Sequence, residues 1–198
     1  MHFKTRTTAA LTLLGAVVCA PSPEARRTDV STVQVAVQEI EVEAPLSPAT
    51  LASMQPRLEL EQLERILESV HDSALRFDLD PVMILAVIHV ESRFDPEAVS
   101  PKGAMGLMQI LPDTAREVAD SLGIELTTDD ELHDPELNIL LGSCYLRYLV
   151  DRFDDHHIAL AAYNAGPTRV AAQWRQTGDV PQAYPARVSK ALERLTAL

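Results

Sequence analysis

One carboxyl group in the sequence is placed where it could transfer a proton. Glu91 ends the most apolar stretch of the chain, and Ile84, Val87 and Ile88 precede it by seven, four and three residues. At that spacing they share its side of a helix. An ionised carboxylate beside an apolar surface is poorly solvated, which favours the protonated form and raises the pKa. Such a group can donate a proton to a leaving oxygen. On spacing alone, a Glu91 that turns outward at a helix end is an equally good interpretation.

Several short motifs follow Glu91 in a fixed order. The first is Glu91, Ser92, Arg93, Phe94, and the second is Ser100, Pro101, Lys102, Gly103, Ala104, Met105, Gly106, Leu107, Met108, Gln109, Ile110. Next come Pro112, Asp113, Thr114, Ala115; then Asn138, Ile139, Gly142, Tyr145, Leu146; and finally Ala162, Tyr163, Asn164, Ala165, Gly166. In this order the motifs resemble the soluble lytic transglycosylase domain, the bacterial relative of goose-type lysozyme, over roughly residues 68–192.

The resemblance implies a role for individual residues. Glu91 matches the catalytic acid/base, and Ser92 the serine that helps to orient the reacting sugar. The cleft-lining segment would be Met105, Gly106, Leu107, Met108 and Gln109, with Gln109 hydrogen-bonded to sugar. Tyr163 and Asn164 would face the glutamate across the cleft, and Tyr184 matches a C-terminal tyrosine near it. The resemblance implies no cofactor.

Structural interpretations of the same residues stay open. Gly106 suits a turn with positive φ, Gln109 could cap a backbone group, and Met108 could fill a gap in the core. Tyr163 could be an ordinary core residue, while Asn138 and Gly142 are assigned to packing.

The sequence departs from the family pattern near Tyr184. The family usually has a Glu-Thr pair shortly before this tyrosine and a valine after it. Here Val180, Pro181, Gln182 and Ala183 precede Tyr184, and Pro185 follows it. We therefore expect an altered C-terminal wall of the cleft.

Helical patterns occupy the chain from residue 58 to its end. Leu63, Ile66, Leu67 and Val70 recur at helical spacing. Asp80 and Pro81 form an N-cap and first helical position, and the helix that follows, to about residue 92, is apolar nearly all round, as a central buried helix is. Further helices are predicted at about 113–122, from 134, and at 157–165, 168–176 and 184–196, with a loop at 124–133. Residues 58–198 are thus predicted to form one all-α, lysozyme-like catalytic domain.

The N-terminal segment predicts export. Residues 1–20 combine a basic start with a short apolar run, as a signal peptide does. The location would be the periplasm or cell envelope. Lipid anchoring through Cys19 is the less favoured alternative, because valines rather than small residues precede it. Residues 21–57, with five prolines, are predicted to be a disordered linker that catalysis does not need and that a cell-envelope protein partner could use.

Charge and histidine placement argue against other classes of ligand. The formal net charge is −12, and cleavage after Ala20 would make it −14. A protein with this net negative charge repels nucleic acid. His156 and His157 are adjacent and point to different faces of a helix, so no metal site is predicted.

The favoured hypothesis is an exported peptidoglycan lytic transglycosylase. Glu91 alone would act on the bond between N-acetylmuramic acid and N-acetylglucosamine and leave 1,6-anhydromuramic acid ends. The first alternative is a muramidase that adds water and needs a second carboxylate. The candidate acids for that role, Asp95, Glu97 and Asp113, all lie in predicted turns or at a helix start. The second is a catalytically silent glycan-binding scaffold.

Overall fold

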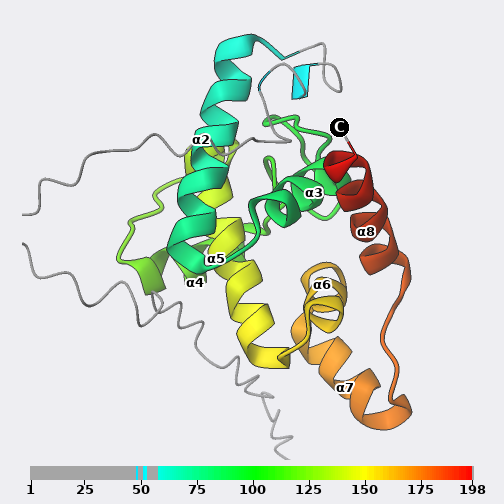
Figure 1. Cartoon of the computed structure of the whole chain (residues 1–198). Coiled ribbons are helices and arrows are strands. Elements are labelled where there is room, and N and C mark those ends of the chain that lie inside the picture. Colours follow the sequence, from blue (N-terminus) through cyan, green and yellow to red (C-terminus); the bar gives the residue numbers. More distant parts are fainter. Residues whose placement is uncertain (1–47, 49–50, 53–57, 198) are drawn as a thin grey trace, which may run out of the picture.

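The computed structural model describes Pro48, residues 51–52 and residues 58–197, and within these residues it is all-helical (Figure 1). The helices are α2 (Leu60–Phe77), α3 (Pro81–Glu91), α4 (Pro112–Leu122), the 3-10 helix η2 (Asp129–His133), α5 (Pro135–Phe153), α6 (His156–Ala165), α7 (Pro167–Thr177) and α8 (Ala183–Thr196). The only extended pairing in the described part is two isolated antiparallel bridges, Val99 with Met105 and Met105 with Ile110. The predicted all-α class is confirmed.

The central helix is α3. Asp80 Oδ1 accepts a hydrogen bond from the backbone N–H of Val82 at 2.8 Å, and Pro81 occupies the first turn, as the sequence predicted. All five residues from Ile84 to Ile88 are fully buried. The helix packs against α2 and α8, and Figure 1 shows it between them. This packing fixes the direction in which the last residue of α3, Glu91, leaves the core.

Two long helices form the framework around α3. Figure 1 shows α2 and α5 running side by side, and they share the most extensive helix–helix contact in the described domain. Asp134 caps α5 by accepting a hydrogen bond from the backbone N–H of Leu137 at 2.9 Å. A second, smaller core lies between the C-terminal part of α5, α6 and Val170 of α7.

Two features differ from the sequence-based expectation. The predicted loop at 124–133 contains η2, which begins at a capping box made by Thr128 and Glu131. Leu51, inside the segment predicted to be a disordered linker, is helical and fully buried in the main core. The linker prediction is therefore corrected at this residue, because Leu51 packs as part of the domain.

The predicted signal peptide, Cys19 and most of the predicted linker lie outside the described residues. Among the helices that the structure describes, none is both long enough and apolar enough to span a bilayer.

Candidate active site

Glu91 lies at a cleft of about 690 Å³. The cleft is bounded by the end of α3, the loop at 100–111, the first turns of α4, the second half of α5, the end of α6 and the start of α7. Glu91 is half-buried there, at the end of a helix whose preceding residues are in the core. The helix therefore holds one carboxyl group at the boundary between the apolar interior and the cleft.

The surroundings of Glu91 favour its protonated form. Burial raises the pKa of the Glu91 carboxyl above its ordinary value, while the Tyr184 hydroxyl and the Arg187 guanidinium oppose that shift. The Tyr184 hydroxyl is itself buried and has no hydrogen bond of standard length and angle within the described structure. Its contact with Glu91 is thus looser than a standard hydrogen bond, and burial decides the direction of the shift. A raised pKa keeps the carboxyl group in its acid form to a higher pH, as a general acid requires.

All four tyrosines of the chain form one continuous row from α5 to Glu91. The ring centroids of Tyr148 and Tyr145 are 6.2 Å apart, those of Tyr145 and Tyr163 5.5 Å, and those of Tyr163 and Tyr184 6.4 Å. Burial, and secondarily the Glu91 charge, raise the pKa values of Tyr163 and Tyr184 well above the ordinary value. Both phenols therefore stay neutral. We call these four residues the tyrosine row.

The loop at 105–110 is held by the helix below it. Asn138 is fully buried; its Oδ1 accepts a hydrogen bond from Met108 N at 2.7 Å, and its Nδ2 donates to Met105 O at 3.0 Å and Leu132 O at 2.8 Å. A Cβ added to Gly106 would lie 2.2 Å from the Asn138 amide, and one added to Gly142 2.6 Å from Met108 Sδ. The Tyr163 hydroxyl then donates to Met108 O at 2.9 Å. These contacts fix the loop relative to α5 and α6.

The structure brings some of the predicted site residues to the cleft and places others in the core. Glu91, Gln109, Tyr163 and Asn164 line the cleft. Leu107 and Met108 have fully buried side chains, and Tyr184 is buried behind Tyr163. Met105 and Gly106 act in the loop through their backbones, as partners of Ile110 and Ala98.

Two predicted sugar-binding side chains make local hydrogen bonds. Ser92 Oγ donates to Ile88 O at 3.2 Å, and Ser92 does not line the cleft. Gln109 Nε2 donates to Ala98 O at 2.8 Å and to Gly106 O at 2.9 Å. Both donors of the Gln109 amide therefore serve the loop, which leaves its carbonyl oxygen to face a ligand.

Sequence reasoning did not assign a set of polar, charged and aromatic residues that also line the cleft. These are Lys102, Thr114, Glu117, Tyr148, Arg152 and Arg169. A signal for some of them exists, because Thr114 and Glu117 are three residues apart on α4, and Tyr145, Tyr148 and Arg152 follow at i, i+3 and i+7 on α5. That spacing would have placed each set on one face of its helix.

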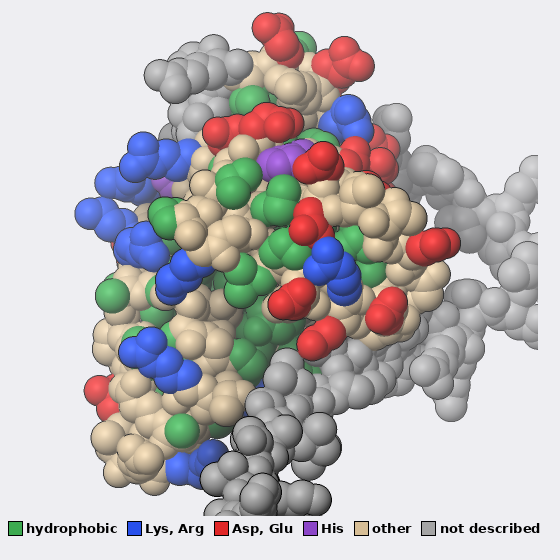
Figure 2. All heavy atoms as spheres, turned by 180° about the vertical axis from the view of Figure 1, so that it is seen from behind, with side chains coloured by type: hydrophobic (Ala, Val, Ile, Leu, Met, Phe, Trp, Pro, Cys, Tyr) green, Lys and Arg blue, Asp and Glu red, His purple; other side chains and the backbone are tan. Residues whose placement is uncertain are grey.

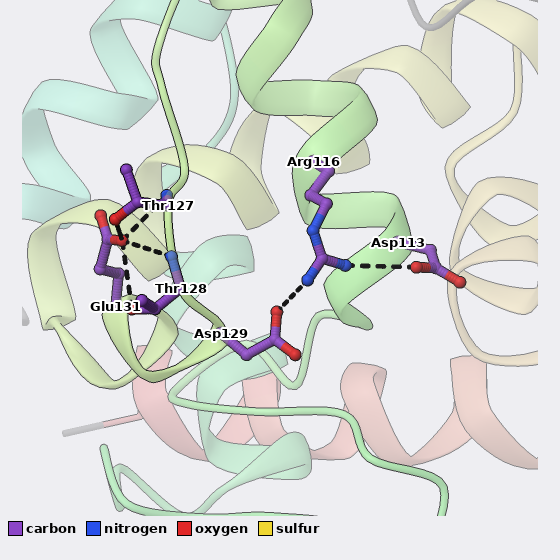
Figure 3. Close-up of polar contacts among 6 residues, drawn as sticks. All are labelled: Asp113, Arg116, Thr127, Thr128, Asp129 and Glu131. Carbon is purple, nitrogen blue, oxygen red and sulfur yellow. Dashed lines mark hydrogen bonds and ion pairs between the residues drawn. The ribbon is translucent and has the colours of Figure 1, made fainter.

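The three acids considered for a second catalytic carboxylate do not line the cleft. Asp95 Oδ1 accepts from Glu97 N at 3.0 Å, and Glu97 lies 3.8 Å from His133 Nδ1. Asp113 pairs with Arg116 at 3.3 Å, and Arg116 also pairs with Asp129 next to the Thr127–Glu131 network (Figure 3). Glu117 is the other acid among the cleft-lining residues.

In the described part of the chain, no group of three His, Cys, Asp or Glu side chains is arranged as metal ligands would be.

Fold and site together define an all-helical domain whose cleft carries one partly buried carboxyl group beside a row of tyrosines. The sequence profile of the transglycosylase SLT domain matches residues 68–184, so the chain belongs to that family.

Relatives agree with this assignment. The chain is 35% identical over 128 residues to the transglycosylase of Enterobacteria phage PRD1, covering 65% of this chain and 43% of the phage protein. It is 43% identical over 88 residues to the soluble lytic murein transglycosylase of Escherichia coli K12, covering 43% of this chain and 14% of that protein. This chain thus spans less than half the length of these relatives.

A solved structure is similar as well. It is an inactive glutamate-to-glutamine mutant of the lytic transglycosylase Slt from Pseudomonas aeruginosa. The TM-score is 0.54 at 28% identity, and the match covers 75% of this chain and 25% of the other.

Proposed function

We propose that this protein is a peptidoglycan lytic transglycosylase in which Glu91 is the single acid and base. The observation that carries the proposal is the half-buried Glu91 carboxyl, whose pKa burial raises, at the edge of a cleft of about 690 Å³. Membership in the SLT domain family and the relatives named as murein transglycosylases supply the substrate class.

In the proposed reaction, Glu91 protonates the oxygen that links N-acetylmuramic acid to N-acetylglucosamine, and the bond from that oxygen to the muramoyl C1 breaks. The resulting Glu91 carboxylate removes the proton from the muramoyl C6 hydroxyl, whose oxygen bonds to C1 and closes a 1,6-anhydro ring. Because the hydroxyl belongs to the reacting sugar, ring closure has a high effective concentration and needs no bound water. Tyr184 and Arg187, which stabilise the carboxylate form of Glu91, would assist the second step.

Mass spectrometry of the sugars released from purified peptidoglycan tests this function. We expect anhydro ends from the natural chain and a loss of at least about a hundredfold in rate for Glu91→Gln, which keeps the side-chain volume but has no transferable proton. The inactive glutamate-to-glutamine mutant of the Pseudomonas relative supports this expectation. A folded Glu91→Gln protein that releases sugars at the natural rate would contradict the assignment.

The hydrolytic alternative has one candidate in the cleft. Glu117 lines it together with Glu91, so a muramidase mechanism would require Glu117 to place the attacking water. Glu117→Gln should therefore keep anhydro products in our proposal, with Asp95→Asn and Glu97→Gln as exposed controls within a few-fold of the natural rate. Reducing-end products that disappear in Glu117→Gln would identify a muramidase instead. No products from any of these proteins would indicate the glycan-binding scaffold.

We further propose that the protein is exported to the cell envelope, because residues 1–20 have the pattern of a signal peptide. We also propose that the proline-containing segment after it is a linker that contacts a cell-envelope protein partner. Fractionation of cells that produce the full chain, followed by mass measurement of the mature N-terminus, would decide between cleavage after Ala20 and a lipid on Cys19.

A further inference from the structure

One exposed side of α8 carries three cations. Arg187, Lys190 and Arg194 are exposed and follow one another at intervals of three and four residues, so they share one side of the helix. The opposite side of α8 is buried in the main core and consists of Tyr184, Val188, Ala191 and Leu195. Figure 2 shows Lys and Arg gathered along the edge of the molecule on which α8 lies. We call Arg187, Lys190 and Arg194 the α8 cations.

The α8 cations are not paired with acids of the folded domain. None of them forms an ion pair with another described residue, whereas Arg65, Arg116 and Arg147 do. The Arg187 guanidinium lies 5.3 Å from the centre of the Tyr184 ring, a contact that does not neutralise its charge. None of the three lines the cleft. They therefore form a positive surface outside the cleft, in a protein whose formal net charge is −12.

The N-terminal part of the sequence offers a matching set of acids. Glu39, Glu41 and Glu43 lie outside the described residues and alternate with Ile40 and Val42. Residues 28–56 contain four acids and no Lys or Arg. In an extended chain, alternate residues point to the same side, so these three carboxylates would form a single row. We call the three glutamates the acidic row.

The dimensions of the two sets agree. In an extended chain the acidic row would be about 13 Å long from its first residue to its third. The α8 cations span about 10 Å along their helix, from a rise of 1.5 Å per residue. The long, flexible side chains of Lys and Arg can cover the remaining difference of about 3 Å.

The connection between the acidic row and the domain is long enough to reach α8. Leu51 is fully buried in the same core as Leu195 of α8. Glu43 precedes Leu51 by eight residues, so it can lie up to about 27 Å from it. The 14 residues of α8 make a helix about 21 Å long. Contact within one chain is therefore possible, and the covalent connection gives the acidic row a high effective concentration at α8.

We infer that the acidic row docks on the α8 cations of the same chain. The contact is formed by exposed ion pairs, so it is reversible and sensitive to salt. The inference does not depend on the proposed function, because the α8 cations lie outside the cleft and the test below measures no activity.

The few lysines of the chain make a direct test possible. Only Lys4, Lys102 and Lys190 are present, and Lys190 is the one on α8. A carbodiimide joins a lysine amine to a carboxylate that touches it, with loss of water, and mass spectrometry of the digested full chain identifies the pair. We expect Lys190 to be linked to the acidic row and Lys102 not to be. The yield should fall between about 50 mM and 500 mM salt, because exposed charges are screened.

A mixture of isotope-labelled and unlabelled chains shows whether the link lies within one chain. Links between chains, to the acids of α2 or to the acidic row of another copy, would show self-association and overturn the inference. The absence of a link at Lys190 would also overturn it, provided that acetic anhydride acetylates Lys190 and so shows that the amine is accessible. Equal yields at Lys190 and Lys102 would show unspecific contact and have the same consequence.

A double variant tests the contribution of the charges beside Lys190. Arg187→Gln with Arg194→Gln keeps the reacting amine but should lower the yield of the link about fivefold, which corresponds to about 1 kcal/mol for two exposed ion pairs. Arg169→Gln with Arg175→Gln removes two exposed arginines of α7 and should leave the yield unchanged. An equal fall in both double variants would show a general effect of net charge and contradict the docking.

A second measurement does not depend on cross-linking. A carboxylate beside an amine favours its charged, unreactive form. Replacing the acidic row by Glu39→Gln, Glu41→Gln and Glu43→Gln should therefore raise the rate at which Lys190 is acetylated by about twofold or more, and leave the rate at Lys102 unchanged.

The matched control for this measurement removes three exposed glutamates of α2. Glu61→Gln, Glu64→Gln and Glu68→Gln together should leave the acetylation rate of Lys190 at its natural value. A rise in this control but not in the acidic-row variant would assign the contact to α2 of a second copy. An unchanged rate in the acidic-row variant would overturn the inference.

Discussion

At the scale of single residues, the pKa of Glu91 links activity to stability. Its pKa is raised in the folded protein by burial, so the folded state binds more protons than the unfolded state between the ordinary pKa and the raised one. Stability is therefore full below the ordinary value and decreases as pH rises through the raised pKa.

Glu91→Gln removes this dependence, because glutamine does not titrate. We expect the variant to have a higher Tm than the natural protein at pH 7–8 and an advantage that shrinks to near zero by about pH 4. Thermal unfolding of both proteins across that range measures it. An advantage that is constant with pH would mean that Glu91 ionises as freely in the cleft as in the unfolded chain.

Tyr184 shifts the pKa of the Glu91 carboxyl group. Its hydroxyl lowers the pKa of Glu91, so Tyr184→Phe should move the high-pH fall of kcat/KM to a higher pH. The maximal rate should change by about fivefold or less, because one weak hydrogen bond contributes about 1 kcal/mol. The pH profile of kcat/KM is the measurement, and Tyr148→Phe, at the far end of the tyrosine row, is the control that should leave the profile in place. A profile unmoved in Tyr184→Phe would show that its hydroxyl does not act on Glu91.

The sequence indicated Glu91 because one helix supplied both its apolar neighbours and its position at a helix end. It did not indicate Glu117 or Arg152, which reach the cleft only through the packing of α4 and α5 against the rest of the domain. Nor could spacing show that Leu107 and Met108 turn inward, since that depends on the buried Asn138 amide thirty positions further along the chain.

At the scale of elements, Asn138 joins α5 to the cleft loop. Its three hydrogen bonds are all to backbone groups of the loop at 105–108 and of η2. Asn138→Ala would remove all three of these buried hydrogen bonds, and we expect a loss of about 2–4 kcal/mol of unfolding free energy. Chemical denaturation measures it, with the exposed Asn164→Ala expected within about 0.5 kcal/mol of the natural protein. A small loss in Asn138→Ala would mean that water replaces the amide.

Leu51 belongs to the folded domain. Its side chain is fully buried in the main core, so Leu51→Ala should cost about 2–5 kcal/mol, as removal of a buried leucine does. A chain that starts at residue 47 should unfold at the same denaturant concentration as one that starts at residue 21, while a chain that starts at residue 58 should unfold earlier. Equal denaturant midpoints for all three chains would mean that Leu51 does not stabilise the domain.

Helix ends were predictable where a capping residue precedes a proline. Asp80 and Asp134 show this at α3 and α5, and both boundaries agree with the structure to within a residue or two. The 3-10 helix η2 was not predictable in the same way, because it has only five residues and depends on the Glu131 side chain, which accepts hydrogen bonds from the backbone of Thr127 and Thr128. Leu51 was missed because the surrounding prolines resemble a linker and one buried leucine leaves no periodic pattern.

At the scale of the whole molecule, charge is unevenly divided. The acidic part, residues 58–137, includes α2, α4 and η2, and the residues from 138 onward include the basic face of α8 with Arg187, Lys190 and Arg194. The two parts meet at the cleft, which residues from both sides line. An anionic polymer would therefore be repelled by most of the surface and accepted along one edge, which raises productive encounters at low salt.

The tyrosine row also determines what optical spectroscopy can measure in this protein. Because every tyrosine of the chain belongs to the row, near-ultraviolet dichroism of tyrosine reports on the cleft and on Tyr184 buried next to it. The single tryptophan, Trp174, is 44% exposed on α7 and does not line the cleft, so its emission is an internal reference. Saccharide binding to Glu91→Gln should change the tyrosine dichroism and leave the tryptophan emission maximum in place. Occupancy of the cleft can thus be followed optically without any attached label.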